Sequence, residues 1–172
     1  MAEQTKFLID ANSFITPHLT YYPFDFAPSF WSQMEERISD GSIVILDMVK
    51  DEILHGNDSL CEWMTSLNIG TYVDHRMPDI LRNYGKVLQY VQNHPCYKQS
   101  ALQEWSKASV ADAWIIATAI ACGYTIVTFE KAVGNLSERN PSKNAKIPNV
   151  ASEFGVSVVS LYDMMRTLGF HL

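Results

Sequence analysis

Four short runs of hydrophobic residues divide the chain, at residues 6–9, 43–46, 125–128 and 156–159. Each run is too short for a helix, and each is followed by polar or turn-forming residues. Continuous hydrophobic runs of this length are typical of strands that are buried on both faces, as in a parallel sheet. We therefore expect four such strands, and a weaker candidate strand at residues 71–73.

The segments between these runs have the spacing of helices. We expect an aromatic and proline-rich loop at residues 17–28, and a buried helix at 109–122 because that segment is hydrophobic on nearly every face. The alternation of strands and helices predicts an α/β fold with a central, mostly parallel sheet flanked by helices on both faces. The other expected helices are residues 29–38, 48–55, 59–67, 79–92, 98–107, 150–154 and 161–168.

Length and composition indicate one ordinary globular domain over residues 1–172, with 47% hydrophobic and 19% charged residues. The three cysteines, Cys61, Cys96 and Cys122, are widely spaced, which argues against a disulfide framework or a thiolate zinc site. The longest apolar stretch, residues 113–122, is too short to span a bilayer, and the amino terminus does not read as a signal peptide. We expect a cytoplasmic protein that does not contact membranes.

Four acidic residues lie where a predicted strand ends or on a predicted helix: Asp10, Glu52, Asp112 and Glu130. Because the carboxyl ends of parallel strands meet at one edge of a sheet, residues far apart in the sequence can become neighbours there. Each acid also has a purely structural explanation. Asp10 can form a turn, Asp112 can belong to a capping box with Ser109, and the other two can be surface acids.

A cluster of these four carboxylates would need a cation or protons. Two carboxylates about 6 Å apart repel by roughly 3 kcal/mol at an effective dielectric constant near 20. Ligands that are all oxygen suit Mg²⁺ or Mn²⁺, and the five histidines have no metal-ligand spacing. The sequence therefore predicts a magnesium or manganese site.

The net charge of −6 disfavours a nucleic-acid partner, but the positive charges are unevenly distributed. Four of the 13 Lys and Arg residues lie in one Gly, Ser, Asn and Pro-rich segment after Glu130: Lys131, Arg139, Lys143 and Lys146. A basic loop beside an acidic metal site suits a nuclease, and we interpret these four residues as candidates for RNA binding. A solvated loop without a ligand is the alternative.

Several segments together resemble the PIN-domain family in their order and spacing. They are residues 7–13 (FLIDANS), 49–53 (VKDEI), 111–119 (ADAWIIATA) and 125–130 (TIVTFE). The aromatic segment 21–31 and residues 146–150 resemble a bacterial branch of that family without an assigned function. The resemblance implies a single PIN-like domain that binds Mg²⁺ or Mn²⁺ and cleaves single-stranded RNA, as an endoribonuclease toxin of a toxin–antitoxin pair.

The resemblance also implies roles for individual residues. Asp10, Glu52, Asp112 and Glu130 would be the catalytic metal ligands, with Asn12, Ser13 and Thr128 in support. The expected partners are an RNA substrate, an antitoxin protein and a second copy in a homodimer. The chain departs from the family pattern at Glu130, where Asp is usual, at Asn149, where the similar branch has Asp, and in an insertion at about residues 74–107.

Other classes of protein remain to be weighed. An aspartyl phosphohydrolase needs a second Asp at the position of Asn12, and fingerprints for dinucleotide binding, a P-loop or a serine hydrolase elbow are missing. A non-catalytic PIN-like module for protein interaction and a structure-specific DNA nuclease stay open. The aromatic residues of segment 21–31 could stack on RNA bases, pack in the core or bind an antitoxin.

Overall fold

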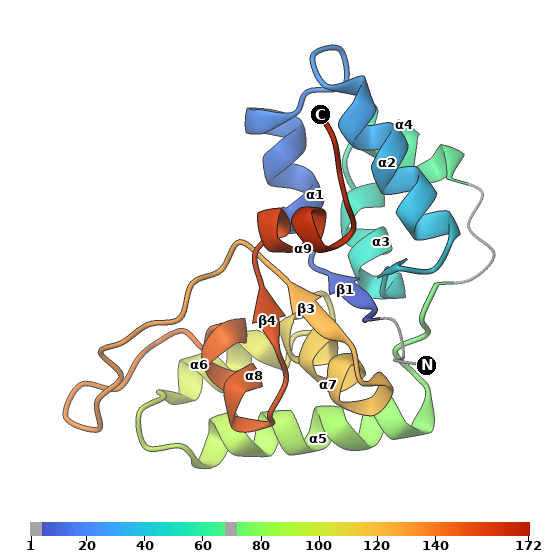
Figure 1. The fold of residues 1–172 in the computed structure, drawn as a ribbon. Helices are drawn as coiled ribbons and strands as arrows, with labels where there is room; N and C mark the ends of the chain where they lie inside the picture. Colours follow the sequence, from blue (N-terminus) through green and yellow to red (C-terminus); the bar gives the residue numbers. More distant parts are fainter. Residues whose placement is uncertain (1–4, 68–71) are drawn as a thin grey trace.

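Four short strands form one parallel sheet in the computed structural model, which describes residues 5–67 and 72–172 (Figure 1). The strand order is β2-β1-β3-β4, and every neighbouring pair is parallel. Each strand lies within one of the predicted hydrophobic runs, and the predicted α/β class is confirmed. The strands are β1 (Phe7–Ile9), β2 (Ile43–Val44), β3 (Thr125–Val127) and β4 (Val158–Val159).

The two central strands, β1 and β3, form the middle of the core. Leu8 and Ile9 on β1 and Ile126 and Val127 on β3 are completely buried. Ile9 pairs with Val127 at the carboxyl end of both strands, so the residues that follow them leave the sheet at the same point. This register decides which polar side chains meet at that edge.

Helices surround the sheet. In the view of Figure 1, α5 to α8 lie in the lower half and α1 to α4 in the upper half together with α9. The helices are α1 (Asn12–Thr16), α2 (Pro28–Ser39), α3 (Asp47–Leu54), α4 (Ser59–Ser66), α5 (Pro78–Asn93), α6 (Gln99–Trp105), α7 (Asp112–Cys122), α8 (Ile147–Glu153) and α9 (Leu161–Thr167).

Helix α7 is the buried helix that the sequence predicts. Ile115, Ile116 and Ala117 are completely buried, and the helix packs against α5 and β3. It ends at Gly123, whose φ of 71° is left-handed, a conformation that glycine adopts without a steric penalty. The chain can therefore turn at once into β3, which begins two residues later.

Three sequence predictions need correction or restriction. The segment 17–28 is not all loop, because a π-helical turn, η1 (Pro17–Tyr21), continues directly from α1. Ser109 does not cap α7: this helix begins at Asp112, and its N-cap residue, Ala111, makes no side-chain capping bond. The weak strand 71–73 reduces to a single bridge between Val73 and Leu46, and residue 71 lies outside the described residues.

No helix in the described part of the chain is both long and apolar enough to cross a membrane.

Candidate functional site

The carboxyl edge of the two central strands places Asp10 beside Thr128. The backbone N–H of Asp10 donates to the carbonyl of Val127 at 3.0 Å, which continues the pairing of β1 and β3 by one residue. The hydroxyl of Thr128 then donates to Oδ2 of Asp10 at 2.9 Å. Both side chains are buried, with relative exposures of 5% for Asp10 and 4% for Thr128. The sheet register therefore orients this carboxylate.

Burial and neighbouring negative charge raise the pKa of Asp10 to about 6. Desolvation is the largest cause, the hydrogen bond from Thr128 opposes it, and the charges of Glu52 and Glu130 add to the rise. Asp10 follows β1, Glu52 lies on α3 and Glu130 lies in the loop after β3. Because the charges of Glu52 and Glu130 affect the pKa of Asp10, these three segments bring their carboxylates near one another.

Asp112, the first residue of α7, completes this group. Its pKa is raised to about 7, first by desolvation and then by the charges of Asp10 and Glu130, while Lys146 opposes the rise. The pKa of Glu52 on α3 is also raised, by desolvation and then by Asp112, although its side chain is more exposed. The structure thus gathers all four sequence-predicted acids at one edge of the sheet.

Glu130 differs from the other three acids because both oxygens of its carboxylate already accept hydrogen bonds from the protein. Its Oε1 lies 3.0 Å from Nζ of Lys146, and its Oε2 accepts the backbone N–H of Ile147 at 2.8 Å. Ile147 is the first residue of α8, so Glu130 holds the start of that helix. The backbone N–H of Glu130 in turn donates to the hydroxyl of Thr128 at 3.1 Å, which links this acid to Asp10 through one side chain.

The predicted supporting residues have unequal roles. Ser13 is buried, and its hydroxyl donates to the carbonyl of Val127 at 3.3 Å, which ties α1 to the end of β3. Asn12 is the exposed first residue of α1, two positions after Asp10. Asn149 does not join the acids, because its side-chain amide exchanges two hydrogen bonds with the backbone of Val133 in the loop after β3.

The predicted RNA-binding residues lie on the long loop between β3 and α8. This loop extends away from the sheet on the left of Figure 1. Lys131, Arg139 and Lys143 are exposed on it. Lys146, at the end of the loop, is the member of this set that forms an ion pair with one of the four acids.

A pocket of about 370 Å³ adjoins the acidic cluster. Glu52 belongs to both, because it lines the pocket and its pKa responds to the charge of Asp112. The pocket lies between α3, the segment after Val73 and the turn before α7. Its lining residues are Met48, Asp51, Glu52, His55, His75, Ala108 and Ser109.

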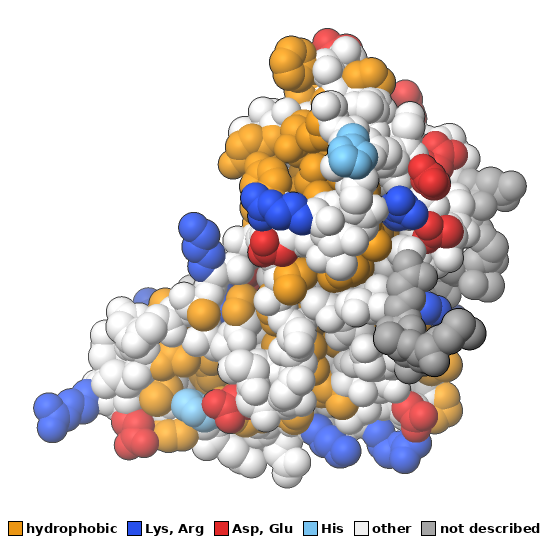
Figure 2. Space-filling view, viewed as in Figure 1, with side chains coloured by type: hydrophobic (Ala, Val, Ile, Leu, Met, Phe, Trp, Pro, Cys, Tyr) orange, Lys and Arg blue, Asp and Glu red, His pale blue; other side chains and the backbone are white. Residues whose placement is uncertain are grey.

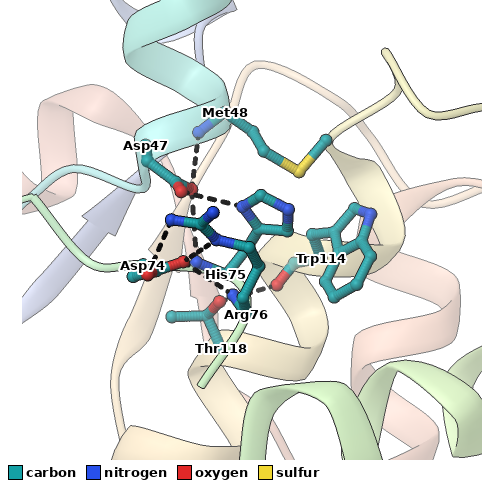
Figure 3. Close-up of polar contacts among 7 residues, drawn as sticks. All are labelled: Asp47, Met48, Asp74, His75, Arg76, Trp114 and Thr118. Atoms are coloured by element: carbon teal, nitrogen blue, oxygen red, sulfur yellow. Dashed lines mark hydrogen bonds and ion pairs between the residues drawn. The ribbon is translucent and has the colours of Figure 1, made fainter. Parts of the chain in front are cut away.

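A second polar cluster joins α3 to the segment before α5, and sequence reasoning did not find it (Figure 3). Oδ2 of Asp47 lies 2.8 Å from Nδ1 of His75, and Oδ1 of Asp47 accepts the backbone N–H of Met48 at 2.8 Å. Asp74 is paired with Arg76 at 2.9 Å. Because each carboxylate already has protein donors, the cluster serves to fasten this segment to the start of α3.

Asp47, Asp74 and His75 are also the one group of three acidic, histidine or cysteine side chains in the described residues whose ligand atoms lie within 4.8 Å of one another. No three of the four predicted acids therefore lie this close together. Direct binding of one ion by three of them therefore requires their side chains to come closer together. No signal in the sequence links Asp47 to His75, 28 residues away.

The aromatic segment 21–31 divides between core and surface. Phe24 stacks on Trp31 with ring centroids 4.3 Å apart, and Tyr22 stacks on Phe30 at 4.5 Å, so these rings pack inward. Tyr21 is 46% exposed and lies nearly parallel to Phe129, with centroids 6.3 Å apart. Figure 2 shows hydrophobic side chains gathered on the upper part of the molecule, in the region where Figure 1 places α1 and the turn that continues from it.

The fold and the site define an α/β protein with a four-stranded parallel sheet that carries an acidic cluster at its carboxyl edge. The family model described as "Domain of unknown function (DUF4411)" matches residues 7–172, and the chain belongs to that family. A search of curated proteins found no match. The family match covers the acidic cluster and the pocket and names no activity.

Proposed function

We propose that this protein is a PIN-like, metal-dependent endoribonuclease that cleaves single-stranded RNA. One observation carries the proposal: four carboxylates from four separate segments share one edge of the sheet, where two of them have a pKa raised to about 6 and about 7. Ionising such a group is unfavourable without a cation. A divalent cation relieves both causes of the shift, because it replaces lost hydration and neutralises the repulsion.

The donor set fits Mg²⁺ or Mn²⁺. Asp10, Asp112 and Glu52 offer carboxylate oxygens, the ligands that these hard cations prefer. Asp112 lies in the first turn of α7, where the helix dipole favours an ionised carboxylate. Glu130, already bound to Lys146 and Ile147, would contribute through its charge or through a bound water.

Each protein group has a defined task in this proposal. A divalent ion held by these carboxylates would activate a water molecule and stabilise the negative charge on the phosphate. Thr128 holds the carboxylate of Asp10 in one orientation by donating its hydroxyl hydrogen. The basic residues of the loop after β3, Lys131, Arg139, Lys143 and Lys146, would attract the RNA backbone toward the acidic edge.

The resemblance to PIN-domain toxins extends the proposal to biology. We infer that the protein is the toxin of a toxin–antitoxin pair. A partner protein would inhibit the toxin, and two copies of the chain could form a homodimer. The exposed hydrophobic side chains Leu19, Tyr21 and Phe26 provide surface that a protein partner could cover.

The test is a cleavage panel of labelled single-stranded RNA, duplex RNA, and single-stranded and branched DNA, each with Mn²⁺, Mg²⁺ or EDTA. Wild type is compared with Asp10→Asn and Asp112→Asn, and with Asp163→Asn as the control. Asp163 also lies in the first turn of a helix but is exposed and far along the sequence from the acids. We expect metal-dependent cutting of single-stranded RNA that the first two variants lose and the control keeps.

Two alternative functions give different results in the same panel. A structure-specific DNA nuclease cuts branched DNA with the same residue dependence. A non-catalytic interaction module cuts nothing, and the two protein donors that bind Glu130 favour this reading because they give that acid a structural role. Equal cleavage by wild type and both site variants would contradict the nuclease proposal altogether.

A further inference from the structure

The pocket beside Glu52 has chemistry of its own that the acidic cluster does not use. It is about 370 Å³ in volume, within the range of roughly 300–1,000 Å³ that small-ligand pockets occupy. Glu52 forms the boundary between pocket and cluster, since it lines the first and interacts electrostatically with Asp112 in the second. A ligand in the pocket therefore lies against one member of the acidic cluster.

The lining of the pocket disfavours the phosphate of a nucleotide and suits its base. Two carboxylates, Asp51 and Glu52, line the pocket, and no lysine or arginine stands among its described lining residues. A phosphate would be repelled there. Flat or apolar groups are also present, from His75, His55 and Met48, and such groups contact the faces of planar rings.

His75 is held in place from two sides. Asp47 accepts a hydrogen bond from Nδ1 at 2.8 Å, and because a carboxylate only accepts, Nδ1 carries the hydrogen and Nε2 is left for a ligand. The imidazole also meets the ring of Trp114 edge-on, with centroids 4.9 Å apart, and Trp114 stacks on Tyr84 at 3.6 Å. Figure 3 shows the imidazole between Met48 and the indole of Trp114. The pocket wall is thus built before any ligand arrives.

We propose that this pocket binds the nucleobase next to the phosphodiester that is cut, an inference that rests on the proposed ribonuclease function. The carboxylate of Asp51, which is not one of the four acids, accepts hydrogen bonds and donates none, so it selects a base edge with an amino group. Cytosine, adenine and guanine have one, whereas the single ring donor of uracil, N3–H, stands between two carbonyl oxygens that a carboxylate repels. The pocket therefore makes the enzyme discriminate against uridine at one position beside the cut.

Direct binding of nucleosides tests the pocket without any cleavage. Saturation-transfer difference NMR is recorded on the full chain in EDTA with cytidine, adenosine, guanosine and uridine. Ala108→Trp fills the pocket from an exposed turn, and Gln103→Trp places the same side chain on the exposed face of α6, outside the pocket. We expect base-proton signals for the three amino nucleosides, loss of at least about tenfold in affinity in Ala108→Trp, and no change in Gln103→Trp.

A cleavage assay supplies the second readout. RNAs that differ at single positions around the cut are compared, and uridine at one position should slow cleavage by roughly tenfold, about the loss of one hydrogen bond to a charged acceptor. Ala108→Trp should remove this preference. Nucleoside binding that is undetectable, equal for uridine, or unchanged in Ala108→Trp would overturn the pocket assignment, whatever the cleavage panel shows. Nucleoside binding with the expected pattern but no RNA cleavage would support the pocket and overturn the nuclease.

Discussion

Replacing Asp112 by Asn should stabilise the metal-free protein at high pH. The pKa of Asp112 is raised from 3.8 to about 7 in the folded state, chiefly by desolvation and then by Asp10 and Glu130. A group with a raised folded-state pKa favours folding while it is protonated. That contribution is complete below the unfolded pKa and is lost as the pH rises through the folded pKa. Asn keeps the shape of the neutral acid and carries no charge to lose.

The size of the effect follows from the shift. A folded-state pKa about three above the unfolded value corresponds to about 4 kcal/mol. This is the largest gain in the free energy of unfolding that we expect from Asp112→Asn at pH 8. Because the charges of Asp10 and Asp112 repel each other, protonation of either one removes part of the repulsion. The gain can therefore be smaller than this limit. We expect Asp112→Asn to raise the free energy of unfolding by about 2 to 4 kcal/mol at pH 8 and by less than about 1 kcal/mol at pH 4.

Urea unfolding in EDTA, followed by tryptophan fluorescence, measures this difference at several pH values between 4 and 8. Asp163→Asn is the matched control, because Asp163 also lies in a helical first turn but its pKa is lowered, by its hydrogen bond to Ser160 and by Arg166. Its replacement should destabilise slightly rather than stabilise. If Asp112→Asn gains nothing between pH 4 and pH 8, the carboxylate is not confined with its acidic neighbours, and the reasoning fails.

Three further predictions concern the same region. Saturating Mn²⁺, at about 100 times the dissociation constant, should add roughly 2.7 kcal/mol to the stability of wild type and little to Asp10→Asn, as a thermal-shift titration at pH 8 would reveal; equal shifts in both proteins would argue against a metal at this edge. Thr128→Val removes the donor to Asp10 and the acceptor for the backbone of Glu130, so RNA cleavage should fall at least tenfold while circular dichroism stays native; full activity would show that this orientation is dispensable. Tyr21→Ala should weaken RNA binding by roughly 1 to 3 kcal/mol in a filter-binding titration if this exposed ring stacks on a base, and unchanged binding with lower stability would mean that it only packs on Phe129.

The hydrophobic pattern was enough to predict the fold class and most element positions. Runs such as residues 7–9 and 125–127 contain only residues that favour buried strands, and residues 112–122 are hydrophobic on almost every helical face. Local signals failed where tertiary contacts compete with them. Ser109 has the chemistry of a helix cap, yet it lies in the turn that lines the pocket, and α7 starts three residues later at Asp112.

The candidate site was accessible from sequence only as a set of positions. That Asp10 and Glu130 each follow a strand is readable in the chain, because a strand's end is a local property. The strand order of the whole sheet makes β1 and β3 neighbours in register. This pairing brings the hydroxyl of Thr128 to 2.9 Å from Oδ2 of Asp10. The same holds for the tie between Asp47 and His75, which no spacing rule links.

The sequence by itself determined what kinds of element form and which acids stand at their ends, since hydrophobic periodicity and turn chemistry act over a few residues. The tertiary structure decided how these acids share their environment. Desolvation and mutual repulsion depend on the positions of atoms from four segments, and so does the occupation of Glu130 by Lys146 and Ile147. The pocket beside Glu52 exists only where α3, His75 and the turn before α7 meet, so only the folded chain contains it.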